Sequence, residues 1–289
     1  MTHQNVVVGV DGSLIAVRAL DRAAEEAERR AVGLHIVYAV PDSDEAGPVL
    51  ASAATRIRGR CPGLQVVISA LEGGAVDTLT RESEGAALTV VGTRGLGGVA
   101  GLLAGSVSVR LAARVRSPLL VVRHDDPLHR SALGAEREQN RNGRPVLVGL
   151  EGENDADAAA YAFEEAERRD VPLRVLHAVV HGHTTPEMPS PLPATSPGQR
   201  RQTQDDLAEE AMPRFGLALL REEHPDVWVD ARTVRVSPAR ALLEATREAA
   251  VVVIGAHRNT GVLGRRLGPV AHTLLHRSHC PVVLVPTSG

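Results

Sequence analysis

The stretch from Val90 to Val107 reads VVGTRGLGGVAGLLAGSV and decides the fold. An apolar run ends at Gly92, further glycines follow up to Gly105, and from Ser106 the apolar residues recur at helical spacing. This order predicts a buried strand, a glycine-rich loop and the start of a helix. Glycines let the backbone approach a ligand closely, and the free N–H groups of a helix start attract phosphate. The glycines alone leave two interpretations open: a phosphate-binding loop, or a turn between strand and helix that binds nothing.

Around this stretch the chain alternates between expected strands and expected helices. Short, nearly continuous apolar runs predict strands that are buried on both faces of a parallel sheet. The expected helix at 14–31 places Val17, Leu20, Ala24 and Ala27 on one side and Arg and Glu on the other. The expected strands are 5–10, 34–40, 64–71, 87–91 and 118–122, and the expected helices are 14–31, 43–60, 75–84 and 107–115. Such an alternation predicts a doubly wound, five-stranded parallel sheet, with a ligand crevice at the carboxyl ends of its strands.

The whole pattern occurs twice along the chain. PVLVGLEGEND, at 145–155, matches VVVGVDGSLIA, at 6–16, and the segment 251–286 matches 89–123. Between the copies, residues 125–144 are polar, charged and without an apolar period, which is typical of a linker. We therefore expect an α/β protein with tandem domains at 1–124 and 145–289, and a Pro-rich surface insertion at 181–198 in the second.

Composition narrows the classes of function. The 289 residues suffice for two domains, and aromatic residues make up only 2%, so the core must be aliphatic. A net charge of −3 argues against a general nucleic-acid or membrane-surface role. Cys61 and Cys280 lie far apart and lack metal-site spacing, so packing roles in a reducing compartment are expected. The sequence has no signal-peptide pattern and no apolar stretch long enough to cross a membrane, which predicts a cytoplasmic protein.

The spacing of the glycines is more specific than their number. Two residues separate Gly92 from Gly95, nine separate Gly95 from Gly105, and Ser106 follows. This spacing resembles the nucleotide-binding signature of the ATP-binding branch of the universal stress protein family. The segment 106–123 is similar to that family's last helix and strand, and the internal repeat extends the resemblance over nearly the whole chain. Other glycine motifs fit poorly. A Walker loop needs a Lys, which this chain lacks, and a dinucleotide fingerprint follows the first strand.

The resemblance implies two Rossmann-like domains of the adenine nucleotide alpha hydrolase type, with binding roles for residues of the first. Asp11 matches the acidic residue that lies against the nucleoside, and Ala39 and Val40 match the strand end whose backbone meets the adenine. Arg94 stands where the family often has His, and it either reaches the phosphates or points to solvent. The ribose and phosphate loop is matched by Gly92, Gly95, Gly105, Ser106 and Val107.

At the function level the resemblance implies a cytoplasmic regulatory protein that binds ATP, with Mg²⁺ on the phosphates, and acts through an unidentified protein partner. The last strands of the two copies, 118–122 and 281–285, are expected to pair, and two tandem chains are expected to form a homodimer. No loop residue is a general base placed to activate water, so no catalytic residue is assigned. Slow hydrolysis or autophosphorylation stays open, as do an ATP-hydrolysing or nucleotidyl-transferring enzyme and a structural module with both sites empty.

The second copy departs from the signature. Arg258 replaces the second glycine, Pro269 replaces the serine, and Glu151 replaces Asp11. Arg258 does not readily adopt the backbone of a positive-φ glycine, and Pro269 removes a hydroxyl and an N–H from the helix start. The second copy is therefore either a structural partner or a modified anion site using Arg258, Arg265 and Arg266. One ATP per chain, in the first copy, is the expected stoichiometry.

The histidines and a pair of aspartates are the remaining candidates. His177, His181 and His183 cluster at an expected strand end, whereas His272 and His276 lie one helical turn apart, near His279. Neither group has an acidic or cysteine ligand at metal-site spacing, so exposed loop or helix positions are favoured and no metal site is assigned. Asp125 and Asp126 are interpreted as a solvated charge run in the linker.

Overall fold

The computed structural model describes residues 5–40, 46–93, 106–123, 143–178, 217–256, 258–261 and 264–287. The predicted loop residues Arg94, Gly95 and Gly105 lie outside these ranges, as do Asp125, Asp126, the rest of the linker up to residue 142 and the Pro-rich insertion.

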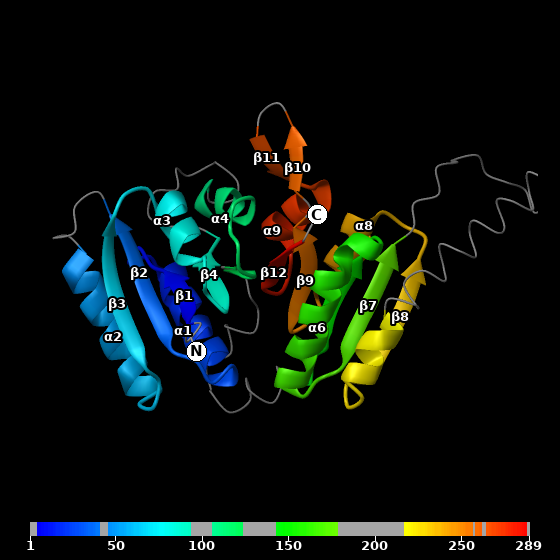
Figure 1. Ribbon diagram of the computed structural model, residues 1–289, viewed down its shortest axis with the longest axis horizontal. Coiled ribbons are helices and arrows are strands. Elements are labelled where there is room, and N and C mark those ends of the chain that lie inside the picture. Colours follow the sequence, from blue (N-terminus) through cyan, green and yellow to red (C-terminus); the bar gives the residue numbers. More distant parts are fainter. Residues whose placement is uncertain are drawn as a thin grey trace, which may run out of the picture.

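The described elements alternate along the first half as the sequence predicts (Figure 1). Two elements begin later than expected. The helix expected at 43–60 begins at Gly47, and the strand expected at 64–71 begins at Val66. In order, the elements are β1 (Val6–Gly9), α1 (Leu14–Arg29), β2 (Leu34–Val40), α2 (Gly47–Arg60), β3 (Val66–Glu72), α3 (Ala75–Glu82), β4 (Leu88–Gly92), α4 (Ser106–Ala112) and β5 (Leu119–Val122).

The second half repeats this order, and its described residues also include a small antiparallel hairpin at the sequence position that matches the glycine-rich loop. The hairpin pairs Arg258 with Leu267 and Gly261 with Gly264, and the sequence pattern did not predict it. The elements are β6 (Val146–Leu150), a 3-10 turn (Glu153–Asp155), α6 (Ala156–Arg169), β7 (Leu173–Ala178), a helical segment at 217–223, β8 (Val229–Val234), α8 (Pro238–Ala245), β9 (Val251–Ala256), β10 (Arg258–Gly261), β11 (Gly264–Leu267), α9 (Pro269–Arg277) and β12 (Val282–Pro286).

One ten-stranded sheet runs through both halves in the order β3-β2-β1-β4-β5-β12-β9-β6-β7-β8. Within each half the strands are parallel, whereas β5 and β12 pair antiparallel, with Leu120 opposite Val283. The predicted pairing of the last strands is therefore confirmed within one chain. In each half the chain order reverses between the first and fourth strands, which is the switch point where α/β sheets bind ligands.

Helices cover both faces of the sheet and enclose two aliphatic cores. The core under α1, α2 and α6 contains Val6, Val8 and the largest fully buried side chain, Phe163. The core under α3, α4, α8 and α9 contains Val7, Leu119 and Leu284. Alternate residues of β1 thus serve opposite cores, as a strand with helices on both faces requires.

The two halves also meet through α1 and α6, which carry the same run, EEAERR, at 25–30 and 164–169. Arg30 reaches across to Glu165 at 2.6 Å and donates to the Tyr161 hydroxyl at 2.8 Å. Arg169 makes the reciprocal ion pair with Glu26. Glu26, which the sequence places on the polar side of this helix, is only 1% exposed. Because α1 packs beside α6, charged side chains that an isolated amphipathic helix would expose to solvent are buried between the two helices.

Candidate functional site

A small cavity of about 100 Å³ lies at the carboxyl ends of β1, β2 and β4 in the first half. Four residues that the sequence assigned to nucleotide binding line it: Asp11, Ala39, Gly92 and Val107. The sheet places the strand ends side by side, and α4 brings Val107 to them from beyond the glycine-rich loop. Ser106 is the first residue of α4. Residues distant in sequence therefore meet at the switch point.

The turn after β1 holds the Asp11 carboxylate in place. Gly12 adopts a φ of +79°, and the backbone N–H of Ser13 donates to Asp11 Oδ1 at 3.0 Å. Ser13 in turn caps α1, because its Oγ accepts the N–H of Ala16 at 3.3 Å. The same short segment thus starts the helix and directs an acidic side chain to the crevice.

Gly92 has a packing role as well as a place in the crevice. A Cβ at this position would lie 2.8 Å from Ile15 Cγ1 and 3.3 Å from the Ile15 carbonyl oxygen, so β4 and α1 approach too closely for a side chain. Gly9 shows the same relation to Leu79, at 2.8 Å from Cδ1. Gly92 is therefore needed for helix–sheet packing whatever the site binds, whereas at Gly9 the Leu79 side chain could move aside.

The two adjacent residues assigned to adenine binding, at the end of β2, lie on opposite faces of the sheet. Ala39 lines the cavity, whereas the Val40 side chain is buried in the core on the other face of the sheet. The Val40 carbonyl accepts the N–H of Gly73 at 3.1 Å. Only Ala39 of this pair lines the crevice.

The second half has a corresponding crevice of about 410 Å³, with a different lining. Glu151 and Pro269 occupy the matching positions, and Pro269 is the first residue of α9. Asp155, which is 2% exposed, accepts the N–H groups of Glu151 at 2.6 Å and Gly152 at 3.3 Å. The altered signature has therefore not closed the crevice. It has changed its polar groups, and the hairpin β10–β11 stands where the first half has its glycine-rich loop.

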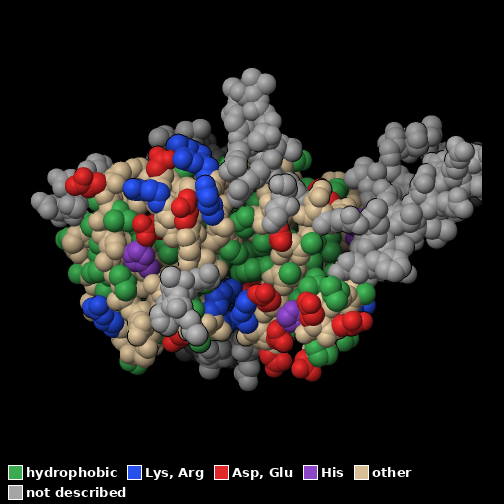
Figure 2. All heavy atoms as spheres, viewed as in Figure 1, with side chains coloured by type: hydrophobic (Ala, Val, Ile, Leu, Met, Phe, Trp, Pro, Cys, Tyr) green, Lys and Arg blue, Asp and Glu red, His purple; other side chains and the backbone are tan. Residues whose placement is uncertain are grey.

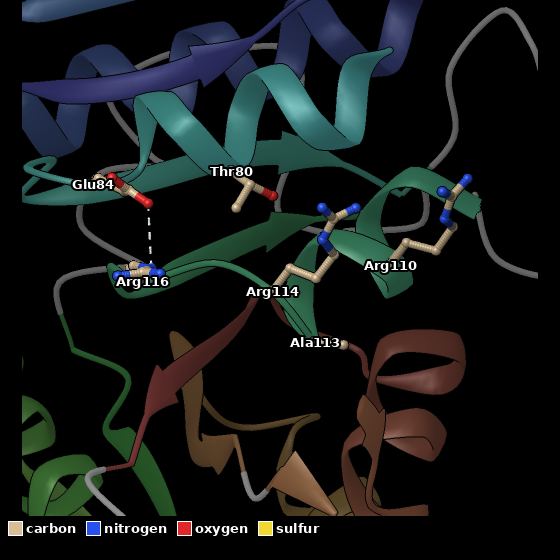
Figure 3. A pocket seen from close by; sticks show the side chains of 6 residues that line it. All are labelled: Thr80, Glu84, Arg110, Ala113, Arg114 and Arg116. Atoms are coloured by element: carbon tan, nitrogen blue, oxygen red, sulfur yellow. Dashed lines mark ion pairs between the residues drawn. The ribbon is translucent and has the colours of Figure 1, made fainter. Parts of the chain in front are cut away.

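A further hollow of about 580 Å³ lies between α3 and α4 and shares no lining residue with the first crevice (Figure 3). Arg114 pairs with Asp77 at 2.7 Å, and Arg116 pairs with Glu84 at 3.3 Å. This group was not predicted from the sequence. Arg110 belongs to α4, whereas Arg114 and Arg116 follow its last residue, Ala112. The hollow is lined by Thr80, Glu84, Arg110, Ala113, Arg114 and Arg116.

The histidine and cysteine candidates do not form a metal centre in the described part of the chain. His177 is buried, with Nδ1 3.0 Å from the Leu150 carbonyl oxygen, while His181 and His183 lie outside the described ranges. His272 and His276 face each other with ring centroids 4.3 Å apart. Among the described residues, no three His, Cys, Asp or Glu side chains gather at one point. No helix in those ranges has the length and hydropathy to cross a membrane.

Comparison with known proteins gives a consistent picture. The model of the universal stress protein family matches residues 2–59, 49–123 and 143–286. A universal stress protein of Mycolicibacterium smegmatis is 31% identical over 307 residues, covering 98% of this chain and 97% of the relative. One from Mycobacterium tuberculosis H37Rv is 32% identical over 308 residues, covering 99% and 98%. The solved universal stress protein of Archaeoglobus fulgidus has the same fold, with a TM-score of 0.60 and 14% identity over 99% of both chains.

Proposed function

The chain belongs to the universal stress protein family, and from this premise we propose that it is a regulatory protein that binds ATP in its N-terminal half. Nucleotide occupancy of that half would alter the surface offered to a protein partner. One observation carries the proposal: Asp11, Ala39, Gly92 and Val107, which match the family's binding positions, line a single crevice at the topological switch point.

The crevice supports nucleoside binding through its shape and its one acidic group. Among its described lining residues Asp11 alone carries a carboxylate, and the others are apolar or glycine. An apolar lining with one hydrogen-bond acceptor suits a base and a ribose, whose hydroxyls donate to a carboxylate. Mg²⁺ would come with the nucleotide, held chiefly by phosphate oxygens and water, and Asp11 is the described residue able to accept from its hydration shell.

The second crevice is expected to bind ATP far more weakly. Pro269 lacks the N–H and hydroxyl that the first half offers at Ser106, and Arg258 stands in place of a glycine. A hydrogen bond to a charged group contributes about 1.5–3 kcal/mol, so the loss of two contacts lowers affinity by orders of magnitude.

Calorimetric titration of the full chain with MgATP tests the proposal. We expect one ATP per chain. The variant Gly105→Val/Ser106→Ala should abolish binding, because a branched Cβ would fill the phosphate space and the hydroxyl is lost. The mirror variant Gly268→Val/Pro269→Ala, at the matching positions, should bind as the wild type does.

Unchanged affinity in Gly105→Val/Ser106→Ala, or loss of binding only in the mirror variant, would assign ATP to the other half. Two equivalent sites per chain would contradict the proposed asymmetry. Circular dichroism and thermal unfolding of both variants establish that the sheet is intact, so that a loss of binding reports on the loop.

A further inference from the structure

Two segments of the chain carry basic side chains and no acidic ones. Residues 106–123, which form α4 and β5, contain Arg110, Arg114, Arg116 and Arg123 without any Asp or Glu. Residues 268–287, which include α9 and β12, contain Arg277 and three histidines, again without a carboxylate. This separation of charge stands out in a chain whose net charge is −3.

The fold brings these two segments together on one face of the molecule. β5 and β12 are neighbours in the sheet, and α4 and α9 cover the same core on the same face. Arg123, at the end of β5, donates to the Leu275 carbonyl of α9 at 2.6 Å. Figures 1 and 3 both show α4 beside α9. We call the surface formed by Arg110, Arg114, Arg116, Arg123, His276 and Arg277 the α4–α9 strip.

At its α4 end the strip opens into the hollow between α3 and α4. Arg110 on α4 and Arg114 in the turn that follows α4 extend in the same direction, and Arg116 lies at the far end beside Glu84 (Figure 3). In Figure 2, arginine side chains gather over α3 and α4 with carboxylates between them. The volume of about 580 Å³ leaves room for several side chains of a ligand.

Four arginines of the strip remain available to an incoming anion: Arg110, Arg114, Arg116 and Arg277. The Arg114–Asp77 and Arg116–Glu84 pairs are exposed, and exposed pairs are weak enough to exchange for another carboxylate. Arg110 and Arg277 are exposed and form no ion pair with any described residue. Burial, followed by the effects of His272, Arg123 and Arg277, lowers the pKa of His276 from its ordinary 6.5, so at neutral pH the arginines carry the charge.

We propose that the α4–α9 strip is the docking surface for an acidic polypeptide segment of a partner protein. Guanidinium groups bind carboxylates in a planar, two-pronged geometry, and Arg110 and Arg114, which extend in the same direction, suit successive acidic side chains. The carboxylates of Asp77 and Glu84 border the arginines and interrupt the basic surface, so it suits the few carboxylates of a short acidic segment better than a long, continuous phosphate backbone.

Binding of a fluorescein-labelled oligoglutamate peptide, followed by anisotropy, tests this proposal. The test variant Arg110→Gln/Arg277→Gln removes two charges from the strip. The control variant Arg58→Gln/Arg60→Gln removes two exposed charges from α2, which packs on the opposite face. We expect the test variant to weaken binding about tenfold or more and the control by less than about twofold, because rim charges act locally in salt. Raising the salt concentration should weaken binding of the wild type.

Equal losses in the two variants would mean that the peptide senses only net charge, and would overturn the proposal. Absence of oligoglutamate binding at low salt would do the same. Duplex DNA is titrated in parallel, and tighter binding of DNA than of oligoglutamate would replace the acidic polypeptide by nucleic acid. Thermal unfolding shows whether each variant keeps its fold. The test uses no nucleotide, so its outcome is independent of ATP binding.

Discussion

At the scale of single residues, Gly92 illustrates how one position serves two purposes. Its place in a spaced motif predicted a role in nucleotide binding. The structure adds that Ile15 leaves no room for a Cβ there. A glycine that is required for packing does not by itself indicate a ligand site. The other residues that line the crevice are therefore stronger evidence for nucleotide binding than the number of glycines.

We predict that Gly92→Ala destabilises the protein by about 1–3 kcal/mol, the range for overpacking a filled interior. The added carbon would lie 2.8 Å from Ile15 Cγ1 and 3.3 Å from a backbone oxygen, so relief needs movement of α1 as well as of a side chain. Urea unfolding measures the change. Gly59→Ala, where nothing lies within 4 Å of the new carbon, is the control and should be neutral or slightly stabilising. Equal stability of Gly92→Ala and the wild type would show that β4 and α1 separate easily.

Some site residues were accessible to sequence reasoning and others were not. Asp11, Ala39 and Gly92 were found because strand ends can be read from apolar runs, and parallel strands end at one edge. The burial of Val40 in the opposite core follows from strand alternation once β2 is known to be covered on both faces. Arg110 on α4 and the arginines that follow this helix were not predicted as a site, because their significance depends on α9, which is distant in sequence.

At the scale of helices and strands, the contact between α1 and α6 is the least expected feature. An amphipathic pattern predicts which side of a helix meets its own sheet, but it does not reveal a second helix beside it. Glu26 and Glu165 are therefore buried, and both are balanced by arginines from either helix. The hairpin β10–β11 was missed for a related reason: matching the segment to the glycine-rich loop of the first half gave no reason to expect strands there.

We predict that Glu26→Gln lowers the free energy of unfolding by about 3–5 kcal/mol, because it leaves buried arginines without their counter-charge. Glu28→Gln, on the exposed side of the same helix, is the matched control and should change stability by less than about 0.5 kcal/mol. Denaturant unfolding of both variants at neutral pH gives the comparison. A Glu26→Gln variant as stable as the control would mean that the ion pairs between α1 and α6 contribute little.

The lowered pKa of Glu26 predicts that the stability of the protein depends on pH. Burial by itself raises the pKa of Glu26, but Arg169, Arg22 and Arg30 outweigh it and hold the pKa well below the ordinary 4.5. A carboxyl with a lowered folded-state pKa stabilises the fold above its unfolded-state pKa, and this contribution is lost as the pH falls further. We therefore expect the wild type to lose stability below about pH 4.5, with a shallower slope in Glu26→Gln. Parallel slopes for the two proteins would assign acid sensitivity to other groups.

At the scale of the whole molecule, the antiparallel pairing of β5 with β12 joins the halves into one sheet. This pairing was predictable because each copy ends in an apolar strand that needs a neighbour on its open edge. The placement of charge on the two sides of the joined sheet was not, since it depends on how α1 meets α6 and α4 meets α9.

We predict that the halves stay together after the chain is cut between them. A protease site inserted within 125–144 allows cleavage of the folded protein. The two fragments should then elute as one species on size exclusion, because the β5–β12 ladder and the pairs between α1 and α6 remain. Cleaved protein in concentrated urea, where the fragments separate, serves as the control. Separate elution without denaturant would show that the covalent link is required.

Joining the copies in one chain has a genetic consequence. In a dimer of identical chains, every substitution appears on both sides of the seam, so neither side can change alone. Here a single chain has Ser106 in its first half and Pro269 at the matching position of its second half. This is possible because the two halves are encoded by separate parts of one reading frame. The pairing is also insensitive to dilution, since tethered partners experience an effective concentration on the order of millimolar. A protein present at a few copies per cell would thus keep its unequal halves together, each free to diverge without the other.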